Sequence, residues 1–243
     1  PHMEIDFHDI ATDPNLSRRE FLKALGGGIF IFFCIGDSSV LEAQRRGGRG
    51  YPEDFNAYLR VGPDGRVTCF TGKIEQGQGA ITSLPQMLAD EMDISPDMVD
   101  MVMGDTAQCP WDMGTFGSMT IRFFGPPLRA AGAEARKVLI ELAAEQLQVP
   151  QDRLAVENGV VFDKQNKDKK VTYADLAKGK IIERHAKEKP PVKDPSAFKV
   201  INKPFLHRDA HDKVTGKARY AGDMCLPDML YAKILRPPAH GAK

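Results

Sequence analysis

Two short segments of the chain combine glycines with hydrogen-bonding side chains. The first, 72–80 (GKIEQGQGA), follows a strand-like run and precedes a helix-like run. Two close glycines at such a turn let a ligand approach the backbone, and the N-terminus of the next helix offers unpaired N–H groups to an anion. Gln78 supplies a donor and an acceptor, which suits the edge of a heterocycle. On pattern alone a plain tight turn is favoured, because the segment matches neither a dinucleotide fingerprint nor a P-loop.

The second segment, 112–120 (DMGTFGSMT), concentrates glycines and hydroxyls without helical or strand periodicity. Backbone amides and hydroxyls in such a loop can bind phosphate or nucleotide groups. A solvent-exposed loop is the competing interpretation and the commoner one for this composition. The two segments together are the candidate binding site.

Other kinds of site find little support. The 33 Lys and Arg balance the 33 Asp and Glu, which argues against a nucleic-acid binder. The four cysteines are far apart and have no C-x-x-C spacing, so they predict neither an iron–sulfur nor a zinc site. His207 and His211 have a ligand-like spacing only if both lie on one helix, which Pro204 disfavours. Arg129 and Arg136 share a helix face, where pairing with carboxylates is commoner than pairing with phosphates.

The elements that must position the two segments follow from periodicity and turn chemistry. Strands are predicted at 58–61 and 66–70, which the turn Gly62–Gly65 joins into a hairpin, at 99–103, and in a second hairpin over 154–162 that turns at Asn158-Gly159. Helices are predicted at 82–92, 128–147 and 173–177. Thr82 or Ser83 is expected to cap the first of these helices. The alternation of strands and helices predicts an α+β domain over 51–181.

The N-terminal part reads as an export signal. Pro1 and His2 are typical of a cloning scar. Ser17–Lys23 (SRREFLK) resembles a twin-arginine signal, and the apolar run 24–36 after it is too short to span a membrane. Residues 1–50 are therefore assigned to scar, signal and linker, and the protein is expected in the periplasm, exported folded and with membrane association left open. A basic patch capping a core helix is the alternative.

The C-terminal part reads as a linker and an incomplete unit. The run 182–204 is rich in Lys, Glu and Pro and is predicted to be a linker. Residues 205–243 form a second unit with expected strands at 218–220 and 230–235. It is too short to close a core of its own.

In combination these segments resemble a known family. Gly72–Gly79 is similar to its E-x-G-Q-G motif, and Gly104-Asp105-Thr106, Thr115-x-Gly117-Ser118 and Gly125–Arg129 follow in the family's order. Arg208–Tyr220 resembles the start of its hammerhead domain. This is the molybdopterin-binding large subunit of the xanthine dehydrogenase and aldehyde oxidase family, in its isoquinoline 1-oxidoreductase beta-subunit-like form. Residues 17–243 match its N-terminal part only.

The resemblance implies a fold, a cofactor and a site. The fold is part of the α+β molybdenum-cofactor domain followed by the start of an α/β hammerhead-like domain. The cofactor is molybdopterin cytosine dinucleotide with molybdenum, shared with a partner chain, and the first loop would approach the pterin while the second binds the phosphate or nucleotide end. The implied cofactor-binding residues are Gly77, Gln78, Gly79, Ala80, Thr115, Gly117, Ser118, Met119 and Thr120.

The resemblance also implies a reaction and partners. An aldehyde or N-heterocycle is hydroxylated with water as the oxygen source, and electrons leave through a small [2Fe-2S] subunit that alone carries the clusters. No residue here is assigned a catalytic or metal-ligating role, because the family's general-base glutamate is expected outside this chain, in the remaining part of the large subunit. A non-catalytic structural or assembly subunit is the alternative.

Overall fold

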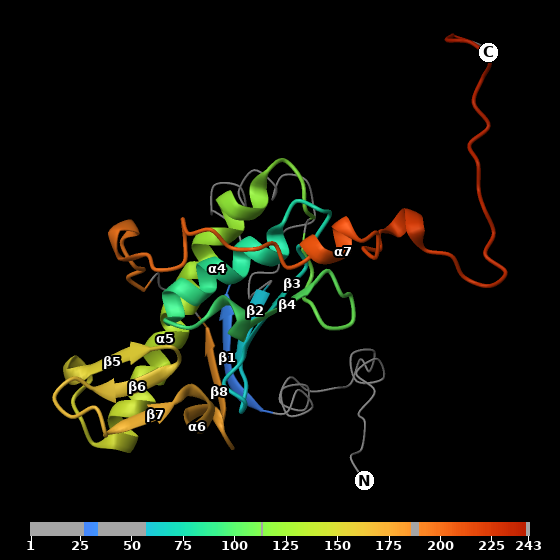
Figure 1. Cartoon of the computed structure of the whole chain (residues 1–243). Coiled ribbons are helices and arrows are strands. Elements are labelled where there is room, and N and C mark those ends of the chain that lie inside the picture. Colours follow the sequence, from blue (N-terminus) through green and yellow to red (C-terminus); the bar gives the residue numbers. More distant parts are fainter. Residues whose placement is uncertain (1–26, 34–56, 113, 186–189, 242–243) are drawn as a thin grey trace, which may run out of the picture. The chain divides into compact units, whose positions relative to one another are not determined.

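The computed structural model describes residues 27–33, 57–112, 114–185 and 190–241. The twin-arginine motif at 17–23 and most of the region assigned to signal and linker lie outside these residues. The chain divides into a first unit, 1–208, and a second unit, 209–243. Figure 1 shows the order of the elements along the chain.

A mixed five-stranded sheet is the base of the first unit. Its order is β4-β3-β2-β1-β8, formed by Val99–Met103, Val67–Thr71, Ala57–Val61, Gly28–Phe33 and Ile181–His185. The predicted hairpin is the antiparallel pair β2 and β3, in which Val61 lies opposite Val67. The outer strands β4 and β8 run parallel to their neighbours.

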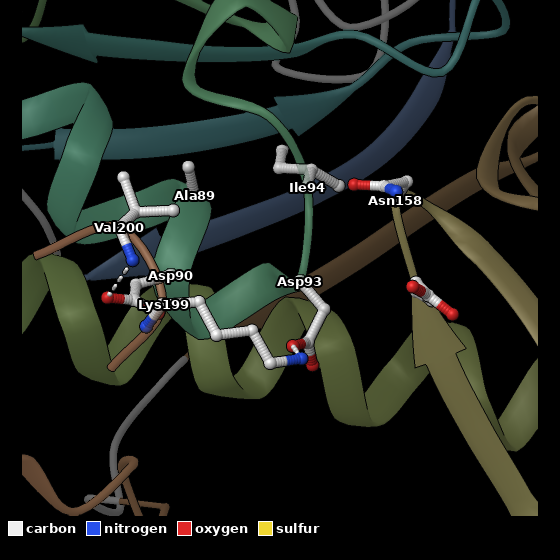
Figure 2. A pocket seen from close by; sticks show the side chains of 8 residues that line it. Ala89, Asp90, Asp93, Ile94, Asn158, Lys199 and Val200 are labelled. Atoms are coloured by element: carbon white, nitrogen blue, oxygen red, sulfur yellow. Dashed lines mark hydrogen bonds and ion pairs between the residues drawn. The ribbon is translucent and has the colours of Figure 1, made fainter. Parts of the chain in front are cut away.

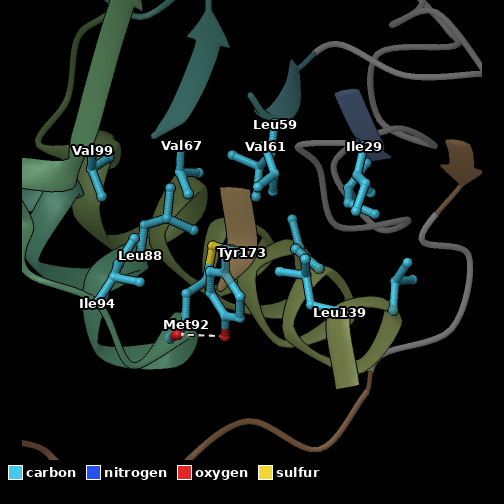
Figure 3. Close-up of a cluster of buried hydrophobic side chains, with 14 of the residues drawn as sticks. Ile29, Leu59, Val61, Val67, Leu88, Met92, Ile94, Val99, Leu139 and Tyr173 are labelled. Atoms are coloured by element: carbon cyan, nitrogen blue, oxygen red, sulfur yellow. Dashed lines mark hydrogen bonds between the residues drawn. The ribbon is translucent and has the colours of Figure 1, made fainter. Parts of the chain in front are cut away.

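Two helices, α4 (Ala80–Met92) and α5 (Gly125–Leu147), pack against each other and form the core with this sheet. Ile29, Leu59, Leu88 and Leu139 are fully buried in the core that sheet and helices share (Figure 3). Tyr173 joins it and donates a hydrogen bond to the Met92 carbonyl over 2.9 Å. None of the helices among the described residues is long and apolar enough to cross a membrane.

A small antiparallel sheet, β5-β6-β7, contains the second predicted hairpin. Its strands are Leu154–Glu157, Val160–Asp163 and Lys170–Thr172, and α6 (Tyr173–Ala177) follows directly. Thr172 caps α6 by accepting a hydrogen bond from the Asp175 amide. The predicted α+β class, the two hairpins and the three helices are thus confirmed.

The sequence reasoning missed strands at both ends of this unit. Gly28–Phe33, within the run expected to be the apolar part of an export signal, forms β1 between β2 and β8. Ile29 and Ile31 face the helices, and Phe30 and Phe32 pack with Tyr58 and Phe70 on the other face. A strand buried on both faces shows no alternation, so its pattern is that of any short apolar run.

The predicted linker 182–204 also differs from the structure. It begins inside β8 (Ile181–His185), which pairs with β1. Residues 193–201, called the strap below, are then held against the end of α4 by hydrogen bonds. Contact with α4, and not composition, decides the conformation of residues 193–201.

The second unit has little regular structure. It contains α7 (Ala210–Val214) and a 3-10 turn at Ala221–Asp223. The strands predicted at 218–220 and 230–235 are wrong, because neither range forms a strand. Leu230 and Leu235 are 94% and 98% exposed. Their side chains therefore have no packing surface within the unit that would stabilise a β-strand there.

Candidate functional site

The structure brings the two predicted segments together. The Lys73 ammonium lies 2.8 Å from Asp112 Oδ1 and donates to the Gly114 carbonyl over 2.7 Å. The Ile74 amide donates to Thr115 Oγ1 over 2.9 Å. Because the Lys73 and Asp112 side chains are only 6% and 1% exposed, this pair ties the loops in a weakly screened environment. Sequence reasoning missed both residues, since a pair 39 positions apart leaves no local pattern.

Gly79 sits at the junction between the first loop and α4. It is the N-cap residue, with φ 87°, a left-handed conformation that residues with a Cβ rarely adopt. A Cβ built there would lie 2.5 Å from Cε1 of His207. The expected cap by Thr82 or Ser83 is wrong, because α4 begins earlier, at Ala80, and Gly79 makes no side-chain cap.

Glu75 fills the position that sequence reasoning left open to an anion. Its Oε1 accepts hydrogen bonds from the amides of Gly77 over 2.7 Å and Gly79 over 3.0 Å, and its Oε2 accepts from the amide of Ile81 over 2.8 Å. The prediction that these N–H groups are unpaired is therefore wrong. A carboxylate a few residues before the first turn of a helix was the signal that could have identified this contact.

Gln78 is also engaged within the first loop. Its Nε2 donates to the Ile74 carbonyl over 2.9 Å and its Oε1 accepts from the Gln76 amide. Both groups that suited a heterocycle edge are thus used to shape the loop. The exposed surface at Gln76–Gln78 is what this segment offers to a ligand.

The second loop has the backbone shape of an anion site. Gly117 and Ser118 have φ values of 63° and 55°, and Met119 follows in the right-handed region. Left-handed residues followed by a right-handed one can turn successive amides toward one point, the arrangement called a nest. The Met119 amide donates to the Phe116 carbonyl over 3.2 Å, so the amides of Gly117 and Ser118 are those that this turn can offer to an anion. Thr120 then begins a π-helical turn, Thr120–Phe124, that continues into α5.

The surroundings of the loops suit a flat organic ligand with N–H donors. Asp112 Oδ2 is buried and has no hydrogen-bond partner in the structure, so it can accept a hydrogen bond from a ligand. Ile74, Trp111, Phe116 and Ile121, from the two loops and the turn after them, are 40–52% exposed. Among the described residues no three His, Cys, Asp or Glu side chains form a metal-binding group. The site therefore has three features that a cofactor could contact: backbone amides, one carboxylate oxygen and apolar surface.

An acidic cluster at the end of α4 holds the strap. The Asp90 carboxylate accepts hydrogen bonds from the amides of Lys199, Val200 and Ile201, the last over 2.8 Å. Figure 2 shows Asp90, Asp93, Lys199 and Val200 around the small pocket they line with Ile94 and Asn158. The strap leads the chain toward His207 and Arg208, and the Arg208 amide donates to Thr82 Oγ1 over 3.0 Å.

The two arginines of α5 serve the same cluster. Arg129 pairs with Glu91 and Arg136 pairs with Asp93, whose side chains are 1% and 5% exposed. This agrees with the commoner expectation for these arginines, carboxylate pairing, although the carboxylates are buried and not on the surface. Arg129 also donates to the Lys193 carbonyl over 2.6 Å, which adds α5 to the strap's attachment.

We expect acid to release the strap. Burial alone would raise the pKa of Asp93, but hydrogen bonds from Lys193 and Lys199 and the charge of Arg136 hold it below its ordinary value. Since this pKa is lower in the folded state, the carboxylate stabilises the fold above the unfolded-state pKa of about 4. That contribution is lost as the pH falls through the folded-state value.

Limited proteolysis of the strap over a pH series measures this effect. Asp93→Asn should loosen the strap at neutral pH and flatten its pH dependence, whereas the exposed Asp168→Asn should behave as the wild type. Equal pH dependence in the wild type and Asp93→Asn would contradict the assignment.

The fold and the site define a class of protein: an α+β domain with two glycine-containing loops that are tied to each other. Comparison with known proteins specifies the class. The family model described as "Molybdopterin cofactor-binding domain" matches residues 4–221. The chain therefore belongs to this family, the molybdopterin-binding subunits of the xanthine dehydrogenase family.

Two curated relatives show the extent of the match. The chain is 35% identical over 184 residues to one of the subunits of the nicotinate dehydrogenase of Pseudomonas putida, covering 76% of this chain and 15% of that protein. It is 29% identical over 226 residues to the beta subunit of the isoquinoline 1-oxidoreductase of Brevundimonas diminuta, covering 76% of this chain and 29% of the relative. Among solved structures, the carbon monoxide dehydrogenase of Oligotropha carboxidovorans aligns at 28% identity and a TM-score of 0.45, over 50% of this chain and 15% of that one. The chain thus spans less than a third of the length of these two curated relatives.

Proposed function

We propose that this chain is the molybdopterin-binding part of a molybdenum hydroxylase that oxidises an N-heterocycle or an aldehyde. The observation that carries the proposal is the direct tie between the two loops, through Lys73–Asp112 and Ile74–Thr115. This tie connects the two loops that carry the predicted cofactor-binding residues 77–80 and 115–120, in a chain that matches the molybdopterin-binding family. The names of the two curated relatives refer to nitrogen heterocycles, which favours that substrate class.

The chain's own residues would bind and orient the cofactor. The 76–78 backbone would lie along the pterin, and the buried Asp112 Oδ2 would accept one of its N–H groups. The amides of Gly117 and Ser118 and the hydroxyls of Ser118 and Thr120 would hold the phosphates of the cytosine dinucleotide form. When bound, the cofactor supplies the redox chemistry and uses water as the oxygen source. The protein contributes position and electrostatics.

We propose that the complete enzyme also contains the rest of the large subunit and a [2Fe-2S] subunit that takes the electrons. Support comes from the second unit, 209–243, none of whose described hydrophobic residues is buried. Apolar side chains at this exposure are typical of surfaces that another chain or segment covers. The general base is proposed to lie in the rest of the large subunit.

Periplasmic location through the twin-arginine route is part of the proposal and rests on the 17–23 motif. The second candidate function is a structural or assembly subunit of the same family. It is favoured by the internal hydrogen bonds of Gln78, whose donor and acceptor groups both bond within the first loop. The two candidates differ in whether the assembled protein holds the cofactor.

The test is to measure molybdenum and released cytidine nucleotide per mole of chain, on protein isolated from its host with everything bound to it. If the chain is the cofactor-binding part of a hydroxylase, we expect close to one molybdenum and one nucleotide per chain. Lys73→Met, which breaks the tie between the loops, should lower both, and Lys167→Met on the exposed β6–β7 turn should not. A fully assembled complex without molybdenum would favour the structural subunit.

A further inference from the structure

The N-terminus of α4 already binds an anion, and that anion belongs to the chain. Glu75 accepts three backbone hydrogen bonds there, from Gly77, Gly79 and Ile81. The amides of Thr82 and Ser83 in the same turn donate to the Gly79 carbonyl, each over 3.0 Å. The donors that attract anions to helix N-termini are thus largely used internally.

The same three contacts determine the shape of the first loop. Gly77 and Gly79 have φ values of 97° and 87°, and glycine is the residue that loses most conformational freedom on ordering. The carboxylate links the amides of both glycines to the first turn of α4, where Thr82 Oγ1 also accepts a hydrogen bond from the Arg208 amide. Gln78, whose side chain folds back onto the Ile74 carbonyl, completes a closed loop.

We infer that Glu75 is a positioning residue of the cofactor site: it occupies the anion position at α4 and holds 76–79 in its binding shape, so that the anionic groups of the ligand bind elsewhere. A second anion at α4 would meet both the repulsion of the carboxylate and the loss of its amide donors. The amides of Gly117 and Ser118 in the second loop are then the anion donors of the pair of loops. The identity of the ligand in this inference rests on the proposed function. The hydrogen bonds of Glu75 are independent of that proposal.

Inorganic phosphate is the probe for this inference. It should bind at the N-terminus of α4 only if the Glu75 carboxylate does not already occupy that position. The experiment follows amide hydrogen exchange of the 74–81 peptide, by mass spectrometry, in the full chain with its bound partners and with or without millimolar phosphate. In the wild type we expect slow exchange that phosphate does not change. In Glu75→Ala the amides should exchange about tenfold faster or more, as expected for the loss of hydrogen bonds to a charged group, and phosphate should slow them again.

Glu75→Gln adds a variant of nearly unchanged size. It keeps one acceptor oxygen but turns an NH₂ group toward the amides, so exchange should be faster than in the wild type and insensitive to phosphate. Glu145→Ala, an exposed glutamate on α5, is the control and should match the wild type. Phosphate protection in the wild type, or wild-type exchange in Glu75→Ala, would overturn the inference.

Molybdenum content separates this inference from the proposed function. A wild-type complex that lacks molybdenum would refute the proposed function and leave the exchange results standing. A Glu75→Ala complex that loads as much molybdenum as the wild type would refute the positioning role and leave the proposed function standing. We expect the Glu75→Ala complex to lose most of its molybdenum.

Discussion

Gly79→Val should leave the assembled protein without molybdopterin. The substitution forces a β-branched residue into a left-handed conformation at φ 87°, which costs about 1–3 kcal/mol for residues other than glycine. The new Cβ would also lie 2.5 Å from Cε1 of His207, so the imidazole must move off the loop. Because Gly79 donates to Glu75 and caps α4, the distortion reaches both the loop and the helix. Molybdenum per mole of chain measures the effect.

Gly179→Val is the matched control for this prediction. Gly179 has a similar φ of 70°, but a Cβ there meets nothing within 4 Å. The Gly179→Val protein should therefore unfold at a lower temperature because of the strained backbone, and it should retain the cofactor. Adding His207→Ala to Gly79→Val should recover part of the stability, since the close contact disappears while the strain in φ remains. Full molybdenum content in Gly79→Val would show that this loop does not contact the cofactor.

Ile31→Asp should prevent the first unit from folding. Ile31 is fully buried in β1, between β2 and β8. An isolated carboxylate cannot be solvated there, and burying one without a partner costs several kcal/mol, comparable to the whole stability of a typical domain, roughly 5–15 kcal/mol. Ile31→Val, which removes only a methylene, should cost about 1 kcal/mol. Solubility and thermal unfolding of the two variants measure the difference.

The position of β1 also bears on the proposed export. Residues 28–33 cannot lie in an export machinery and in the sheet at the same time, and without them β2 and β8 lose their shared neighbour. We therefore expect the mature protein to retain Gly28–Phe33, which sequencing of its N-terminus in the host would show. A folded mature chain that begins after Phe33 would mean that the sheet forms without β1.

The predictable parts of the fold share one property: their pattern is local. The turn at Gly62–Gly65, the hairpin turn at Asn158–Gly159 and the apolar spacing of α4 depend on neighbours within a few residues, and the structure confirms them. β1 and β8 were missed because their pairing joins residues about 150 positions apart. The strands predicted at 218–220 and 230–235 were wrong because alternation needs a partner surface, which the second unit does not supply.

The amino-acid sequence by itself determined the family, the α+β class and the two loops, because the order of short motifs and the positions of glycines are properties of the chain alone. The tertiary structure decided how those loops work. Only the fold shows that Lys73 and Asp112 tie them together, that Glu75 takes the anion position and that His207 lies over Gly79. These contacts depend on distances between side chains and on their burial, and both are set when the sheet, α4 and the strap pack together.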